Sequence, residues 1–310
     1  MMGHPSAAGE FSPQKSRTKN IKRVSISSIL LVLIMIAGMG VFLYPTFSDY
    51  WNSFHQSRAI AGYAEAVSDI NIEEYERMLY QAKAFNATLP GKSNRWKLNQ
   101  REKEIYNKIL NVSGTGIIGY IEIPAIKVDL PIYHGTDEAV LEIAIGHIEG
   151  SSFPVGGKGT HSVLSGHRGH PSAKLFTNLD KLVEGDMFVI RVLDETFTYL
   201  IDQILIVEPE DISALAFDPK KDYCTLVTCT PYGINSHRML VRGHRIANLE
   251  GPNAIMVTSD AQQIDRNITA LFIGTPVLIL FFIRDMATAG KKRRKRLARW
   301  EALDRRLNGV

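Results

Sequence analysis

Cysteine is nearly absent from this chain of 310 residues, which has only Cys224 and Cys229. Both lie in a β-branched run, and the odd spacing puts them on opposite faces of a predicted strand. They would lie about 16 Å apart at roughly 3.3 Å per residue, whereas a disulfide needs Cα atoms within about 7 Å. The sequence therefore excludes a disulfide between them. We expect Cys224 to be a small buried side chain and Cys229 to be a free thiol at the end of the strand, where Pro231 and Gly233 follow.

Metal-binding patterns are also missing. The chain has no pair of cysteines with zinc spacing and no HExxH helix. Three histidines, His161, His167 and His170, are close together in the sequence. However, His161 begins a predicted strand and His167 follows its end, so we do not expect them to converge on zinc. The sequence therefore predicts no metal and no cofactor.

Two apolar stretches without charge lie near the ends of the chain, at residues 26–44 and 268–283. The first is long enough to cross a bilayer, and the second is shorter than a usual span. Basic residues precede the first and follow the second, which places both termini in the cytoplasm and the central part on the extracellular face. A cleaved signal peptide is the alternative for the first stretch, but no small-residue cleavage site follows it. We predict a cell-membrane protein with two transmembrane helices.

The positive charge of the chain is concentrated in its two tails. Residues 1–25 carry +4 and residues 284–310 carry +7, in a chain whose net charge is +4. The part between them therefore carries −7, and it has no general affinity for nucleic acid. The C-terminal basic run alone is also compatible with nucleic-acid binding. Because it follows an apolar stretch, we interpret it as a stop-transfer signal that favours anionic lipid.

The part outside the membrane begins with helical periodicity and continues with strands. Residues 50–112 predict a helical extension, with one helix over 50–85, a Pro-Gly loop, and a second helix within 99–110. Residues 113–250 predict a small, mainly β barrel or sandwich. Its strands are expected at 117–123, 126–132, 160–165, 187–193, 197–207, 223–229 and 238–246. Short helices are expected at 137–145, 173–181 and 211–215.

Three side chains at predicted strand ends have the chemistry for acyl transfer through a thioester. Cys229 is the nucleophile, His167 a proton donor, and Arg238 a cation for the developing oxyanion. Arg238 begins the strand that follows the Cys229 strand, so it should lie near the thiol and favour the thiolate. His237 and Arg242 compete with Arg238 for this role. The alternatives for these residues are packing for Cys229, a backbone contact for His167 and a surface ion pair for Arg238.

These segments resemble the sortases. Residues 225–229 (TLVTC) are similar to the family's TLxTC signature, with Arg238 at the arginine position. Residues 165–169 (SGHRG) are similar to the segment with the catalytic histidine. The longer strings over 165–182 and 225–246 resemble class C sortases, the pilus-polymerising group of Gram-positive bacteria, in which a C-terminal membrane anchor also occurs.

The resemblance implies a closed eight-stranded β-barrel that cleaves an LPXTG-type sorting signal between Thr and Gly. Cys229 would form the thioester, His167 would protonate the leaving amine, and Arg238 would hold the carbonyl oxygen. Thr228 would lie near the substrate backbone. A lysine amine of another pilin subunit would then resolve the thioester, so the expected partners are LPXTG-type pilins.

One segment departs from the family pattern. Many class C sortases have a lid anchored by Asp-Pro and an aromatic residue, and residues 86–100 contain no such triplet. Trp96 is the one candidate for an aromatic plug, and no carboxylate is available in the segment to pair with Arg238. We therefore expect a mobile loop here.

Two other functions fit the same sequence. The first is a sortase that joins surface proteins to cell-wall precursor, which differs only in the amine that resolves the thioester. The second is a non-enzymatic, membrane-tethered β-barrel that binds a partner, with Cys229 as a packing residue. Reaction with a thiol probe at neutral pH separates the second from both enzymes.

Overall fold

The computed structural model describes residues 26–248 and 297–308, together with isolated positions between residues 274 and 284. The chain divides into two compact units, Met1–Tyr44 and Pro45–Val310. The predicted basic tail at residues 1–25 and most of the predicted second span lie outside the described residues.

Helix α1 (Ile26–Asp69) contains the first predicted span. Its apolar side chains in the first unit are exposed, among them Leu30, Leu33 and Val41. Within the described residues, one helix is long and apolar enough to cross a membrane, over Leu33–Asp69. This agrees with a membrane anchor near the N-terminus.

The helix predicted over residues 50–85 is in fact two helices. Helix α1 ends at Asp69, and α2 covers Ile72–Thr88. The break occurs because Asn71 acts as an N-cap, whose side-chain oxygen accepts a hydrogen bond from the Glu74 backbone N–H at 2.8 Å. The second predicted helix is confirmed as α3 (Gln100–Tyr106), which begins with a capping box.

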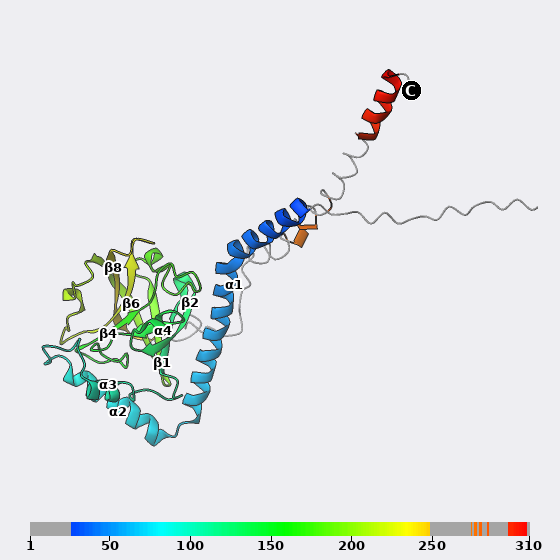
Figure 1. Cartoon of the computed structure of the whole chain (residues 1–310). Coiled ribbons are helices and arrows are strands. Elements are labelled where there is room, and N and C mark those ends of the chain that lie inside the picture. The colour runs from blue at the N-terminus through cyan, green and yellow to red at the C-terminus, as the bar shows by residue number, and fades with distance from the viewer. Residues whose placement is uncertain are drawn as a thin grey trace, which may run out of the picture. The chain divides into compact units, whose positions relative to one another are not determined.

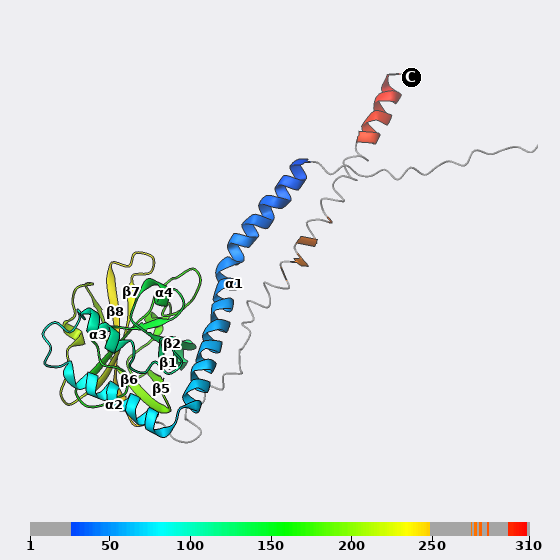
Figure 2. The same cartoon turned by 60° about the horizontal axis from the view of Figure 1, so that its bottom comes forward.

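The β-rich part forms a closed barrel of eight strands (Figures 1 and 2). The strands follow the order β1-β2-β3-β4-β7-β8-β6-β5, and the pairs β2–β3 and β4–β7 are parallel. Their bounds are Ile117–Ile123 (β1), Val128–His134 (β2), Ile145–His147 (β3), Thr160–Ser165 (β4), Met187–Val192 (β5), Glu195–Val207 (β6), Asp222–Thr230 (β7) and His237–Ile246 (β8). The predicted closed barrel is therefore confirmed.

Strand β3 is the one strand that the sequence pattern did not predict. Residues 137–145 were expected to be a helix, but the helix is the single turn α4 (Glu138–Leu141) and residue 145 begins β3. A strand of three residues is too short to show an alternating pattern. The other two short helices are the 3₁₀ turns η2 (Leu179–Lys181) and η3 (Ser213–Leu215).

Two apolar clusters lie on the two faces of β7. Cys224 and Leu226 belong to the main core, which fills the barrel and includes side chains of α2 and α3. Val227 belongs to a second cluster, with Val163, Leu215 and Leu240. Because neighbouring residues of a strand point to opposite faces, this second cluster lies on the outer face of the barrel. We call these four residues the outer apolar cluster.

Candidate active site

The two cysteines differ in their surroundings, as expected from their spacing. Cys224 is fully buried in the barrel core, and burial raises the pKa of its thiol well above its usual range. Cys229 is half-buried at the end of β7, on the same face as the outer apolar cluster. Only Cys229 can therefore present a thiol to a substrate.

Arg238 lies directly opposite Cys229 in the antiparallel β7–β8 pair. Facing side chains of such a pair have Cβ atoms about 5 Å apart. Nη1 of Arg238 donates to the backbone carbonyl oxygens of Asn235 and His237, at 3.1 Å each. No carboxylate forms a salt bridge with Arg238 among the described residues. The Arg238 side chain thus starts opposite Cys229, and only its Nη1 is bonded to described residues, which leaves Nε and Nη2 as donors for an oxyanion.

The two competitors of Arg238 have other partners. Arg242 forms an ion pair with Asp202 at 3.0 Å and lies over the ring of Tyr223. His237 is 3.2 Å from Glu208 and contacts the Ser236 hydroxyl. Its register partner is the residue after Cys229. The geometry therefore favours Arg238.

His167 follows the end of β4, the parallel neighbour of β7. Its ring stacks on His170, with centroids 5.4 Å apart. Partial burial, and then the proximity of His170, lower the pKa of His167 below its usual value. At neutral pH the ring is therefore mostly neutral, and its protonated form is a stronger acid than free imidazolium.

The residues that flank His167 are bonded to residues around Cys229. The Gly166 carbonyl accepts a 2.8 Å hydrogen bond from the Thr228 hydroxyl. On the other side, Arg168 Nη1 donates to the Thr230 hydroxyl at 3.0 Å. These contacts place the imidazole-bearing loop beside the thiol. No hydrogen bond joins the Cys229 sulfur to either candidate partner in the described part of the chain, an arrangement common before substrate binds.

Thr228, which the resemblance places near the substrate backbone, precedes Cys229 in β7. Its side chain is buried and its hydroxyl is already donated to Gly166. The hydroxyl oxygen keeps lone pairs that can accept a hydrogen bond from a backbone N–H. The bond to Gly166 also connects the end of β7 to the histidine loop, and the predicted place of Thr228 near the substrate stays a prediction.

His161 is separated from His167, as expected. It is fully buried, with Nε2 2.7 Å from the Thr225 hydroxyl and Nδ1 2.9 Å from the Ala216 carbonyl oxygen. Burial lowers the pKa of His161 to about 4. Within residues 26–248 and 297–308, no group of three His, Cys, Asp or Glu residues could hold a metal ion.

The chain is similar to known proteins of one family. A family model described as the sortase domain matches residues 121–246. The crystal structure of sortase C1 from Streptococcus agalactiae is 49% identical; the match covers 62% of this chain and 100% of that chain, with a TM-score of 0.60. The chain belongs to the sortase family.

Other relatives agree with this assignment. Sortase C of Streptococcus pneumoniae is 42% identical, with 63% of this chain and 99% of that chain covered and a TM-score of 0.56. Sortase D of Bacillus subtilis (strain 168) is 34% identical over 131 residues, which span 41% of this chain and 63% of that protein. The chain thus covers less than two thirds of this curated relative. The two solved structures are both sortases C, as the class C resemblance predicts.

The segment expected to be a mobile loop is packed onto this sortase barrel. Arg95 is only 9% exposed, and its Nη2 donates to the Leu215 carbonyl at 2.8 Å. Its guanidinium lies 4.1 Å from the centroids of both the Trp96 and Phe217 rings. At Gly150 a Cβ would lie 2.1 Å from the Arg95 carbonyl oxygen, so only glycine fits beneath the segment. The expectation of a free loop is therefore wrong.

Trp96 packs against the outer apolar cluster. Two members of this cluster, Val227 and Leu240, lie two residues from Cys229 and Arg238 on the same strands and on the same face. The cluster on which the ring packs therefore extends along the sheet to the neighbours of the thiol. Sequence reasoning identified Trp96 but missed Arg95, because no pattern links it to carbonyls far along the chain.

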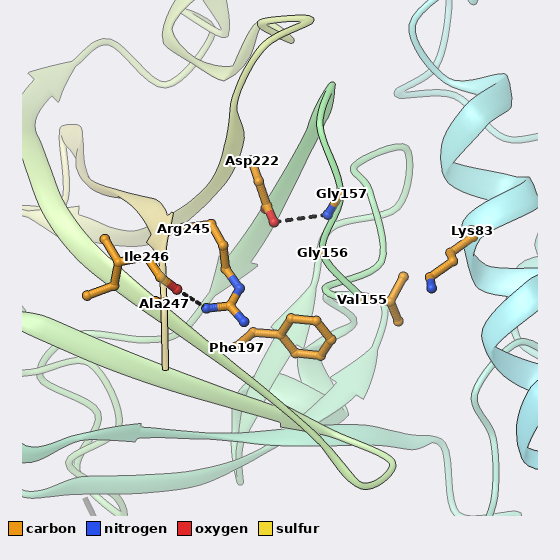
Figure 3. A pocket seen from close by; sticks show the side chains of 9 residues that line it. All are labelled: Lys83, Val155, Gly156, Gly157, Phe197, Asp222, Arg245, Ile246 and Ala247. Atoms are coloured by element: carbon orange, nitrogen blue, oxygen red, sulfur yellow. Dashed lines mark hydrogen bonds between the residues drawn. The ribbon is translucent and has the colours of Figure 1, made fainter. Parts of the chain in front are cut away.

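A hollow of about 530 Å³ lies at the other end of β7 (Figure 3). Asp222, which begins β7, lines it together with Arg245 and Lys83. The Asp222 carboxylate accepts hydrogen bonds from the Gly157 N–H at 3.0 Å (Figure 3) and from the Tyr199 hydroxyl at 3.1 Å. Cys229 is seven residues further along the strand, roughly 23 Å away at 3.3 Å per residue. The hollow is therefore separate from the reacting groups.

Proposed function

We propose that the protein is a cysteine transpeptidase that cleaves an LPXTG-type sorting signal between Thr and Gly and joins it to a lysine amine of another pilin subunit. The observation that carries this proposal is the pairing of Cys229 with Arg238 across β7 and β8. The hydrogen bonds between the neighbours of His167 and the neighbours of Cys229 support it. A pneumococcal relative described in connection with pilin substrate specificity, 42% identical, favours a pilin as the substrate.

In the first half-reaction, the neutral His167 ring takes the proton of the Cys229 thiol, and the sulfur attacks the threonine carbonyl carbon. The negative charge that develops on the carbonyl oxygen is stabilised by Arg238. The C–N bond then breaks, and the glycine amine leaves with a proton from His167. A thioester between the threonine and Cys229 remains.

In the second half-reaction, a lysine amine attacks the thioester carbon. His167 takes the proton from this amine, the C–S bond breaks, and an isopeptide bond forms. Because partial burial and His170 lower the pKa of His167, its neutral form is available to accept that proton at neutral pH.

The proposed location is the cell membrane, with the barrel on the extracellular face. Helix α1 supplies the N-terminal anchor. The second span over residues 268–283 and the cytoplasmic position of both tails rest on the apolar and basic pattern of the sequence.

Transfer to competing amines tests the proposed function. The full chain in detergent is incubated with an LPXTG peptide and equal concentrations of a lysine-containing peptide, blocked at its N-terminus, and a wall-precursor stem peptide. We expect an isopeptide product on the lysine side chain, identified by mass spectrometry, and no product with Cys229→Ala. Exclusive transfer to the stem peptide would instead identify a wall-anchoring sortase. Absence of any thioester with the native chain would favour a binding module.

A further inference from the structure

Helix α1 has two different faces just beyond the apolar stretch. Phe47, Trp51 and Phe54 are each about half exposed, at 56%, 56% and 48%. Their spacing of four and three residues puts them on one side of the helix, and Arg58, also exposed, continues the same side. We call these four residues the aromatic face.

The opposite side of the helix is bonded to the barrel. The Asp49 carboxylate accepts the Lys174 backbone N–H at 2.9 Å and pairs with its ammonium at 3.0 Å. The Asn52 side chain donates to the Ser172 carbonyl oxygen at 2.8 Å. At 3.6 residues per turn, Asp49 and Asn52 lie roughly opposite Phe47 and Trp51. The aromatic face therefore points away from the catalytic domain.

We propose that the aromatic face rests in the headgroup layer of the membrane, so that this part of α1 lies along the surface and holds the barrel above it. Exposed aromatic rings beside an apolar span are typical of the membrane–water interface. The face from Phe47 to Arg58 extends roughly 16 Å along the helix axis at 1.5 Å per residue, so an upright helix would carry its far end out of the headgroup layer. Pro45, a residue type at which helices bend, separates the apolar stretch from the aromatic face.

The charges along the same side agree with this position. Arg58 follows the aromatic residues and suits lipid phosphate, whereas Glu65 and Asp69, further along the same side, do not, so contact with the headgroup layer ends between Arg58 and Glu65. The contacts of Asp49 and Asn52 are with the loop that starts at His167. The same turn of α1 would thus contact the membrane surface on one side and the histidine loop on the other.

Fluorescence of Trp51 tests this arrangement, which rests on the membrane anchor proposed above. In the full chain, Trp96→Phe and Trp300→Phe leave Trp51 as the one tryptophan. The protein is placed in phosphatidylcholine–phosphatidylglycerol vesicles with bromine near the headgroup or near the bilayer centre. We expect bromine near the headgroup to quench Trp51 fluorescence at least about twofold more strongly than bromine near the bilayer centre. The control carries Trp51→Phe and Glu65→Trp, a reporter about four turns further on the same side, and should not be quenched.

The other outcomes overturn the inference in different ways. If the chain floats with vesicles but Trp51 is not quenched, the aromatic face lies in water and only this inference fails. If Trp51 is quenched only after removal of residues 268–283, the C-terminal apolar stretch covers the face. Quenching that falls as protein concentration rises would show a second copy there. A chain that does not float with vesicles would overturn the proposed anchor itself.

A second inference follows independently from the contacts beside His167. Arg168 is only 10% exposed at its side chain, and its guanidinium bridges Thr230 at 3.0 Å and Asp180 at 2.6 Å. The regular β4–β7 pairing ends at Ser165, two residues before His167. Beyond that point, side-chain bonds of Thr228 and Arg168 connect the two segments.

We infer that Arg168 is a positioning residue that sets the distance between His167 and Cys229. It acts through the neighbours of both residues and touches neither the thiol nor the substrate. A shift of about 1 Å between reacting groups is enough to cost about a hundredfold in rate. This inference rests on the proposed function, because it concerns the same proton transfer.

Rates of acylation test this role. Arg168→Gln and Thr230→Val each remove one partner of the Arg168–Thr230 hydrogen bond. In both variants we expect kcat for thioester formation to fall about tenfold to a hundredfold, with little change in KM. Alkylation of Cys229 by a small probe should change little, because the thiol itself is untouched. Unchanged kcat in folded Thr230→Val would overturn the inference even if Arg168→Gln fails to fold. Failure of the native chain to form a thioester would instead overturn the proposed function.

Discussion

Replacing Cys229 with alanine is expected to abolish thioester formation, whereas Cys224→Ala should leave the turnover rate nearly unchanged. The reason is the alternation of β7, which puts Cys224 in the barrel core and Cys229 at the half-buried end of the outer face. Cys224→Ala removes one buried sulfur, so we expect a loss of about 1 kcal/mol in the free energy of unfolding. Mass spectrometry of the acylated protein with an LPXTG peptide, and chemical denaturation, measure the two effects.

The two cysteine variants control for each other. Both remove the same group from the same strand, so a general disturbance of β7 would affect them equally. Equal loss of acylation in both folded variants would contradict the assignment of Cys229 as the nucleophile. A stable Cys224→Ala variant with full activity, beside an inactive but folded Cys229→Ala variant, is the expected result.

The part of the site that the sequence could predict is the part built from one hairpin. Cys229 and Arg238 belong to consecutive strands, so the length of one turn and strand alternation were enough to bring them together. His167 comes from a parallel neighbour about sixty residues upstream. No periodicity in the sequence specifies which strand lies beside β7, so His167 is predicted from its place at a strand end and from the resemblance, without a spacing that joins it to Cys229.

The contacts that sequence reasoning missed are long-range bonds between side chains and loops. Arg95 reaches the Leu215 carbonyl, and Arg168 reaches Thr230. Each pair is separated by more than sixty residues, and neither depends on a pattern within one strand or helix. Such contacts follow from the way the closed barrel places its loops, and they become visible only once the fold is known.

Arg238→Ala is expected to lower kcat for thioester formation by about a hundredfold or more, with a smaller effect on KM. The oxyanion exists only in the transition state, so a donor aimed at it affects the chemical step more than binding. Removal of one such donor typically costs roughly 3 kcal/mol. Arg238→Lys should recover little activity, because an ammonium cannot reproduce the planar, two-donor geometry of a guanidinium.

Arg242→Ala is the matched control for Arg238→Ala, since both arginines lie on the same face of β8. Arg242 is paired with Asp202 and lies over Tyr223, four residues along the strand from Arg238. We therefore expect its loss to reduce stability and to leave kcat close to that of the native chain. Steady-state kinetics of both variants on the same LPXTG peptide decide the question. Near-normal turnover in Arg238→Ala together with a large loss in Arg242→Ala would mean that the oxyanion forms further along β8, away from the register partner of Cys229.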